Sequence, residues 1–213
     1  ARVSNLGDKL HKGASVFSSQ SIDDLYLGLI SYWKNLESVV IGGNEPLTLM
    51  NGNEPVLNGL NGIQRMMALD MLTYLPDSIL AKVDRAAMGV SLETRVPFLD
   101  HKLVEFAWTL PQSMKLRGGQ SKWALRQVLY RYVPESMIER PKMGFGVPID
   151  SWLRGPLREW AEDLLSEARL QHEGFLNYVP IRKKWTEHLS GRRNWQYQLW
   201  DVLMFQAWLE KNK

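Results

Sequence analysis

Residues 75–100 read LPDSILAKVDRAAMGVSLETRVPFLD and change from an amphipathic helix to a polar connector. Pro76 suits the first turn of a helix, where its missing N–H would have no partner anyway. Gly89 is a natural place for that helix to end. The spacing of the apolar residues predicts that one helical face carries Ile79, Leu80, Val83 and Ala87.

The connector after this helix carries an acid, Glu93, two positions before Arg95. Because Pro97 disfavours helix at the residue before it, we expect residues 91–96 to form a short, rigid strand or loop. Alternation along an extended chain puts Glu93 and Arg95 on the same side, where pairing keeps the acid ionised. The pattern fits two interpretations, a structural ion pair at a helix end and a carboxylate aimed at a substrate.

Two longer motifs bear on that choice. Lys82–Asp100 matches the pattern K-x-D-R-A-x-M-x-x-S-x-E-x-R-x-P-F-L-D, and residues 140–148 read RPKMGFGVP. Both motifs, in this order, resemble the synthetase domain of the asparagine synthetase family, the glutamine-dependent amidotransferases. The resemblance extends over roughly residues 60–210.

The resemblance implies a role for five residues. Glu93 would act near bound aspartate and ammonia as a general base or organiser, and Lys142 would contact phosphate and stabilise charge. Arg95 would orient Glu93, with Asp84 and Arg85 in supporting positions. We therefore expect the Glu93 and Lys142 side chains to converge on one nucleotide-binding cleft. No metal ligand is assigned within this chain.

The implied reaction is the ATP-dependent amidation of aspartate. ATP and Mg²⁺ would convert the side-chain carboxylate to β-aspartyl-AMP with release of pyrophosphate, and ammonia from glutamine would then displace AMP. A related amidotransferase, such as a lactam-forming synthetase with another carboxylate substrate, would share both motifs. A third hypothesis, from a different class, is a non-enzymatic helical module that binds nucleic acid or protein.

The resemblance also implies the fold. We expect a mainly α chain in which residues 1–213 form a single helical domain, the C-terminal portion of an adenine-nucleotide α-hydrolase-like (ATP pyrophosphatase) synthetase domain. The family's parallel sheet, its Ser-Gly-Gly-x-Asp-Ser phosphate loop and its cysteine-nucleophile glutaminase domain have no counterpart in the sequence. We therefore expect a C-terminal fragment that is inactive without the glutaminase domain and the phosphate-loop subdomain.

Composition restricts the class of protein. With 213 residues, 45% of them hydrophobic, and nine Trp, the chain can bury a good core. The absence of Cys excludes disulfides and thiolate metal sites and fits a reducing compartment. Because no apolar run approaches the length of a membrane span, we expect a soluble, cytoplasmic protein.

Local signals predict the elements outside the motifs. Residues 21–33 should form a helix with Ser21 as its N-cap and Trp33 on its apolar stripe. Residues 42–62 are rich in Gly, Asn and Pro and predict a loop. Asp100 should cap a further helix that Pro111 ends.

Residues 115–142 hold seven Lys or Arg and two Glu, a local charge of +5. Within them, residues 121–133 predict a helix with Val128 and Tyr132 facing inward. Its cations form either a solvated face or a surface that neutralises polyphosphate. Because the aromatic residues of this stretch are expected to face inward, few aromatic side chains remain to stack with bases. We therefore consider nucleic-acid binding unlikely on this face.

The C-terminal region predicts three helical segments. Residues 151–168 should be broken at Gly155, and residues 180–189 should form a short helix whose cations, Arg182, Lys183 and Lys184, lie on a solvated face. Residues 194–210 are apolar almost all round, so that helix must be buried on more than one side.

Overall fold

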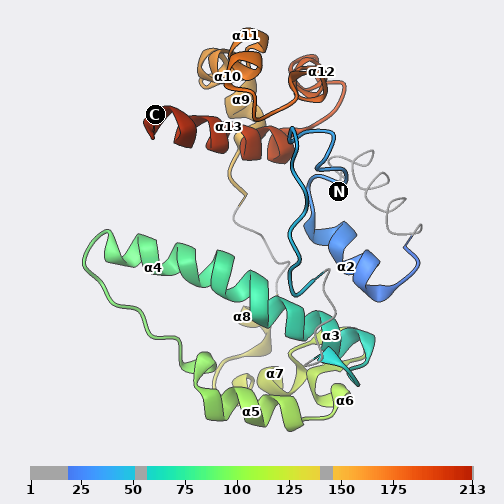
Figure 1. Ribbon diagram of the computed structural model, residues 1–213. Helices are drawn as coiled ribbons and strands as arrows, with labels where there is room; N and C mark the ends of the chain where they lie inside the picture. The colour runs from blue at the N-terminus through green and yellow to red at the C-terminus, as the bar shows by residue number, and fades with distance from the viewer. Residues whose placement is uncertain (1–18, 51–56, 140–145, 213) are drawn as a thin grey trace. The chain divides into compact units, whose positions relative to one another are not determined.

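A computed structural model describes residues 19–50, 57–139 and 146–212 (Figure 1). The chain is mainly helical, as predicted. The strands in these ranges are β1 (Leu116–Arg117) and β2 (Gln120–Ser121), an antiparallel hairpin that the sequence analysis missed. Gly118 and Gly119 make its two-residue turn with φ values of 57° and 78°, a conformation that glycine adopts without steric cost.

The chain divides into two compact units. Unit 1 comprises Ala1–Pro76 and Val147–Lys213, and unit 2 comprises Asp77–Gly146. We describe each unit by itself. That residues 1–213 act as a single domain stays a prediction.

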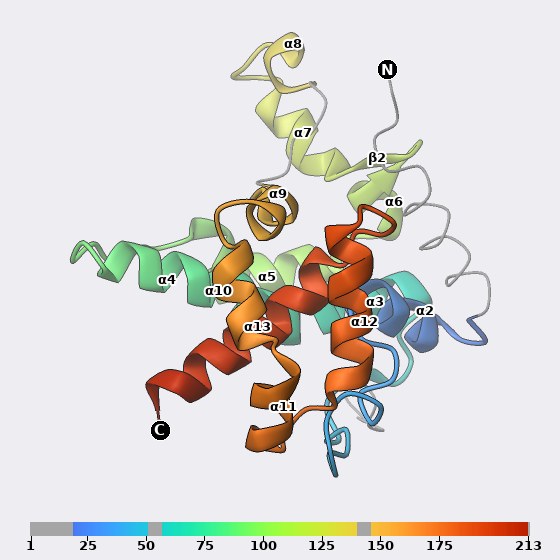
Figure 2. The same ribbon diagram turned by 90° about the horizontal axis from the view of Figure 1, so that it is seen from above.

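The core of unit 1 is built by the last five helices: α9 (Ile149–Arg154), α10 (Arg158–Leu164), α11 (Glu167–Glu173), α12 (Tyr178–Leu189) and α13 (Gln196–Lys211). α13 contacts α9, α10 and α12, which lie over and beside it in the view of Figure 2. Leu199 and Leu203 of α13 are fully buried together with Trp185 of α12. The buried residues of α13 form one stripe, whereas Tyr197, Met204 and Trp208 on the opposite side are exposed, so the prediction of a last helix buried on more than one side is not borne out within unit 1. The predicted break at Gly155 is confirmed, between α9 and α10.

The cations of α12 do not form the solvated face that we predicted. Arg182 contacts Glu162 at 2.7 Å and donates to the Leu165 carbonyl at 3.2 Å. The ammonium of Lys184 lies 3.4 Å from the centroid of the Trp195 ring. Lys183 alone of the three is exposed. The prediction was wrong for the other two because residues outside α12, on α10 and in the turn before α13, contact them.

The first described helix of unit 1 is α2 (Ile22–Ile30). The Ser21 side chain accepts from the Asp24 N–H at 3.0 Å, so the predicted N-cap is confirmed. The helix ends at Ile30, however, and Trp33 lies beyond it, packed against the core of the C-terminal helices. Residues 42–50 lie in turns and coil.

A continuous helical stretch connects the two units: α3 (Gly62–Leu69), the π-helical η2 (Asp70–Leu80) and α4 (Ala81–Met88). Pro76 lies inside η2. Our prediction that it occupies a first turn was therefore wrong. A proline inside a helix lacks the N–H of its hydrogen bond, and π-type stretches are one way in which helices accommodate such a break. Gly89 ends the helix as predicted.

Unit 2 continues with η3 (Pro97–Leu99), α5 (His101–Thr109), α6 (Gln112–Lys115), α7 (Trp123–Leu129) and α8 (Glu135–Ile138). The Asp100 carboxylate accepts from the Lys102 N–H at 2.9 Å, which confirms the predicted cap of α5. α7 is shorter than predicted. Val128 is 52% exposed and Tyr132 is 80% exposed, so neither faces inward as expected. No described residue from 77 to 139 is buried.

Candidate functional site

The connector that carries Glu93 leaves α4 through a tight turn. Ser91 adopts a left-handed conformation with φ of 59°, and the Leu92 N–H donates to the Ala87 carbonyl at 2.9 Å. Residues 92–96 form neither helix nor strand. Val96 is extended, as its position before Pro97 predicts. The turn and the proline therefore define both ends of the segment.

Glu93 and Arg95 form an ion pair, with 2.8 Å between Oε1 and Nη2. The pairing expected from alternation is thus confirmed. The two side chains are 70% and 85% exposed. An ion pair in this setting contributes little to stability, because water screens both charges. The carboxylate is therefore accessible, and its only protein partner in the described chain is Arg95.

A hollow of about 460 Å³ lies between α4 and the connector within unit 2. Thr94 and Val96 line it from the connector, and Asp84 lines it from α4. The other lining residues are apolar: Leu80, Ala81, Val83 and Leu99. Glu93 and Arg95 do not belong to the lining, because alternation directs them to the side opposite Thr94 and Val96.

The five predicted site residues are therefore only partly brought together. Glu93 pairs with Arg95, while Asp84 faces the hollow on the other side of the connector. Arg85 is exposed on α4. Lys142 lies outside the described residues, so its convergence with Glu93 stays a prediction.

Within residues 19–50, 57–139 and 146–212, no three His, Cys, Asp or Glu side chains are grouped closely enough to hold a metal ion. A magnesium ion with several carboxylate ligands would find no ligand set in this part of the chain.

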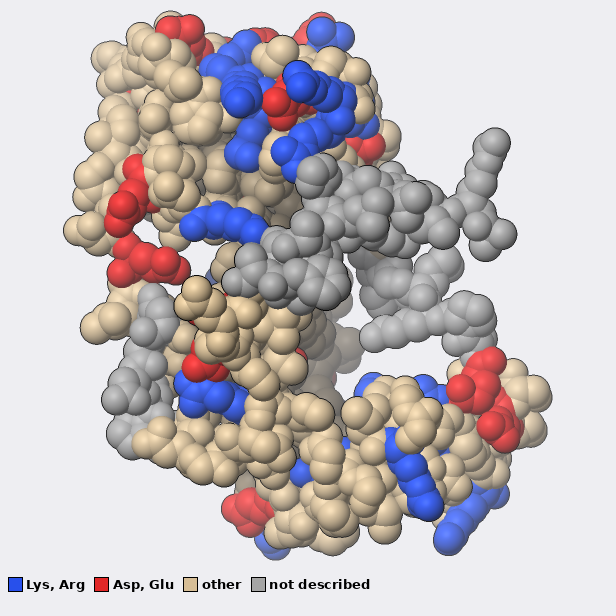
Figure 3. All heavy atoms as spheres, turned by 90° about the vertical axis from the view of Figure 1, so that its right-hand side faces the viewer, with Lys and Arg blue, Asp and Glu red and all other residues tan. Residues whose placement is uncertain are grey.

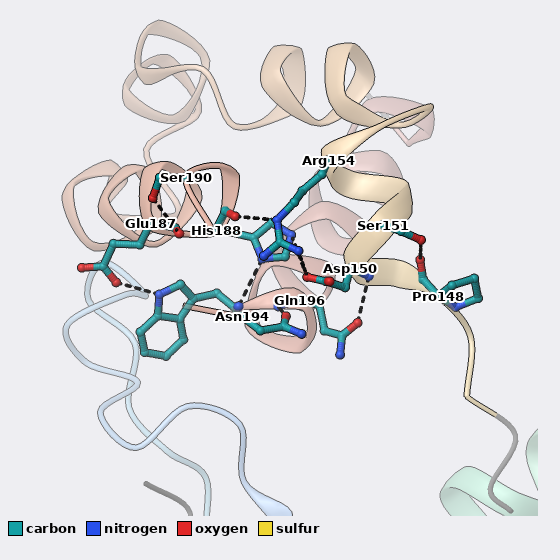
Figure 4. Close-up of polar contacts among 10 residues, drawn as sticks. Pro148, Asp150, Ser151, Arg154, Glu187, His188, Ser190, Asn194 and Gln196 are labelled. Carbon is teal, nitrogen blue, oxygen red and sulfur yellow. Dashed lines mark hydrogen bonds and ion pairs between the residues drawn. The ribbon is translucent and has the colours of Figure 1, made fainter. Parts of the chain in front are cut away.

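A second polar cluster lies in unit 1, where α9, α12 and the start of α13 meet (Figure 4). His188 is fully buried, and its Nδ1 accepts from the Trp195 N–H at 3.2 Å. Its Nε2 therefore carries the hydrogen and lies 3.7 Å from the Asp150 carboxylate. Arg154 contacts the same carboxylate at 2.5 Å and donates through Nε to the His188 carbonyl at 2.7 Å. Gln196 completes the cluster by accepting from the Asp150 N–H at 2.9 Å.

This cluster is structural. Burial lowers the pKa of His188, the Arg154 charge lowers it further, and Asp150 opposes the shift. The nearby hydroxyls point elsewhere: Ser151 donates to the Pro148 carbonyl and Ser190 to the Glu187 carbonyl, as Figure 4 shows. Neither of these two hydroxyls therefore serves the imidazole as the nucleophile that a serine hydrolase would require.

Sequence reasoning missed this cluster, although one signal was present. Ile181, Trp185 and His188 recur at helical spacing on the buried face of α12. A histidine on such a stripe needs buried polar partners. Its partners could not have been named, since Asp150 and Arg154 lie more than thirty positions away.

The structure shows a mainly helical protein with an exposed Glu/Arg pair on the connector between α4 and η3. The sequence profile of the asparagine synthase family matches residues 1–210. The chain belongs to that family.

Curated relatives agree with the profile. A putative glutamine-hydrolysing asparagine synthetase of Mycobacterium bovis is 33% identical over 205 residues, 93% of this chain and 30% of the relative. A glutamine-hydrolysing asparagine synthetase of Bacillus subtilis is 32% identical over 68% of this chain and 23% of its own length. An amidase of Gibberella zeae, chry2, is 29% identical over 50% of this chain and 17% of its own length. The chain thus spans less than a third of the length of these relatives.

No solved structure matches the chain. In the described ranges, no helix is both long enough and apolar enough to cross a membrane.

Proposed function

We propose that this chain forms the C-terminal, helical part of the synthetase region of a glutamine-dependent asparagine synthetase. The observation that supports the proposal most is the family match over residues 1–210. The whole protein would be a carbon–nitrogen ligase that uses ATP to activate the aspartate side chain as β-aspartyl-AMP. Ammonia derived from glutamine would then give asparagine, with AMP and pyrophosphate as the other products.

Glu93 is the proposed catalytic residue of this chain. Its exposed carboxylate would accept a proton from the attacking ammonia or orient it, and Arg95, 2.8 Å away, would keep the carboxylate ionised and fix its direction. Lys142 would stabilise the charge of the phosphates. Asp84 and Arg85 of α4 would support the connector from the other side.

The proposal requires ATP and Mg²⁺. Because the described residues offer no group of metal ligands, we assign the magnesium ligands to other parts of the protein. We likewise assign the glutaminase centre, the parallel sheet of an adenine-nucleotide α-hydrolase-like domain and the phosphate loop to the remaining length that the relatives have. On this view the protein acts in the cytoplasm.

The test is Glu93→Gln in the complete protein, assayed with aspartate, ammonia and ATP. A general base typically contributes about 10²–10⁴-fold to the rate, so kcat should fall by about a hundredfold or more, with an unchanged circular dichroism spectrum. Glu105→Gln is the matched control, because Glu105 is an exposed acid on α5 of the same unit. Equal activity of the two variants would refute the role of Glu93. The 213-residue chain alone should show no turnover.

A second candidate is an amidotransferase relative that acts on another carboxylate. The match to a relative named as an amidase favours retaining it. The complete protein should then consume ATP and ammonia with a carboxylic acid other than aspartate. Measuring pyrophosphate release across a panel of carboxylic acids distinguishes the two candidates, since only the first predicts that aspartate gives the highest kcat/KM.

A further inference from the structure

Four cations gather on one face of unit 1. Lys183 and Lys184 project from α12, and Arg192 and Arg193 from the turn that follows it. We call these four residues the cationic surface. Figure 3 shows Lys and Arg side chains concentrated on the face of unit 1 that α12 forms in Figure 1. This surface is distinct from the basic segment 115–142 that the sequence analysis singled out.

The cationic surface is held in place by Trp195. The Trp195 backbone N–H donates to His188 of the buried cluster, and its indole N–H donates to Glu187 Oε2 at 2.7 Å. Lys184 Nζ and Arg193 Cζ lie 3.4 Å and 4.4 Å from the centroid of the same indole ring. Two cations are therefore fixed close together by one aromatic side chain, through cation–π contacts.

The turn that carries the two arginines is also fixed. Gly191 adopts φ of 73°, where a side chain would be strained, and reverses the chain after α12. The Arg193 N–H then donates back to the Glu187 carbonyl at 3.3 Å. An anion that binds here would consequently meet a preformed arrangement of charges.

The positive charge of this surface is only partly neutralised within the described chain, because Glu187 is the carboxylate that acts on its four cations. No member of the cationic surface forms an ion pair with a described residue. Arg169 of α11 gives the contrast, because Asp163, Glu173 and Glu210 all contact it. Among the described residues of unit 1, the other half-buried cations form ion pairs, whereas the half-buried Lys184 and the exposed Lys183, Arg192 and Arg193 form none.

The pKa shifts of Lys184 and Glu187 also reflect an excess of positive over negative charge at this surface. Burial lowers the pKa of Lys184, and the charges of Arg193 and Lys183 lower it further against the effect of Glu187. Glu187 is the nearby carboxylate, and the Trp195 hydrogen bond, together with Lys183, Arg192 and Arg193, lowers its pKa. An added anion would relieve this repulsion among the cations.

We propose that the cationic surface binds phosphate oxyanions, carried by a free polyphosphate or by a phosphorylated molecule. Arginine offers a planar fork that matches phosphate oxygens, and lysine adds a point charge beside it. Base stacking would need a free aromatic face, whereas Lys184 and Arg193 already lie over the Trp195 ring. Phosphate is therefore favoured over single-stranded nucleic acid. The proposal is independent of the synthetase activity.

The experiment is calorimetric titration of inorganic triphosphate into the 213-residue chain at low salt. K184Q/R193Q should raise the Kd at least tenfold, because it removes both cations at the indole. K102Q/R131Q is the matched control, since it removes two exposed cations of unit 2, and its Kd should equal that of the unsubstituted chain. Should K184Q/R193Q fail to fold by circular dichroism, K183Q/R192Q removes two exposed cations that make no contact with the indole ring and should weaken binding at least threefold.

Titrations with a second phosphate ligand identify the source of the anion. Binding of a phosphoserine peptide, weakened by the same variants, would support a phosphorylated molecule, whereas binding of triphosphate alone would support a free polyphosphate. The proposal is overturned if Lys142→Gln abolishes triphosphate binding while K184Q/R193Q leaves it unchanged. It is also overturned if the chain binds single-stranded DNA but neither phosphate ligand.

Discussion

The two units of this chain differ in what their side chains bury. Unit 1 encloses a core in which Trp185, Leu199 and Leu203 are fully buried around α12 and α13. Unit 2 buries no described side chain, and Phe98 and Phe106 are 60% and 58% exposed. Apolar burial is the main favourable term in folding, so unit 1 carries the stability of the chain. Unit 2 carries the proposed catalytic connector, on helices held mainly by local hydrogen bonds.

This difference suggests a division of roles, in which unit 1 supplies stability and unit 2 carries the proposed catalytic residue. A proposed catalytic carboxylate lies in the unit that lacks its own core, and the buried polar cluster lies in the unit that has one. The following predictions test that division, beginning with the largest expected effect.

The first prediction compares one substitution in the two units. Leu203→Ala removes a fully buried side chain from α13 and should lower the free energy of unfolding by about 3 kcal/mol or more. Leu103→Ala on α5 removes a side chain that is 39% exposed and should cost less than about 1 kcal/mol. Urea denaturation followed by far-UV circular dichroism measures both losses, because both units are helical. Equal losses would show that the packing of unit 2 contributes as much to the free energy of unfolding as the core of unit 1.

The second prediction concerns pH. Because His188 has a lowered pKa in the folded protein, the unfolded chain takes up a proton first as the pH falls below 6.5. Stability is therefore fully present above pH 6.5 and should decrease below it, by up to about 1.4 kcal/mol per pH unit, until folded His188 also protonates. His188→Gln should remove this dependence between pH 6.5 and 5. His101→Gln, an exposed histidine of unit 2, is the control and should retain it.

The third prediction compares two helix caps. Asn177 accepts from the Val179 N–H at 3.1 Å in unit 1, and Asp100 accepts from the Lys102 N–H at 2.9 Å in unit 2. Alanine at either position should remove about 1 kcal/mol. Hydrogen exchange should show the loss throughout the core helices for Asn177→Ala, and within α5 alone for Asp100→Ala. A core-wide response to Asp100→Ala would contradict the division.

The smallest effect is expected for the Glu93/Arg95 pair. A double-mutant cycle with Glu93→Ala and Arg95→Ala should give a coupling free energy below about 1 kcal/mol, because both side chains are largely exposed. The coupling should shrink further in 1 M salt. A coupling of several kcal/mol would mean that the pair stabilises the unit, and would favour a structural role for Glu93.

Features specified by neighbouring residues were predicted correctly from the sequence. The caps at Ser21 and Asp100 and the break at Gly155 each depend on a few adjacent positions. The Glu93/Arg95 pair follows from alternation over two residues. Pro76 is the exception, because the continuation of its helix depends on residues on both sides that can absorb a π-helical stretch.

Features that depend on distant residues needed the tertiary structure. His188 was recognisable only as a polar residue on an apolar stripe, and its partners come from α9 and from the start of α13. The half-burial of Lys184 results from Trp33 and Trp195, which belong to different parts of the chain. Sequence spacing specifies hydrogen bonds within a turn of helix, whereas burial depends on which elements pack together. The sequence by itself thus determined the family, the caps and the ion pair, and packing decided which charges are buried and which are left unpaired.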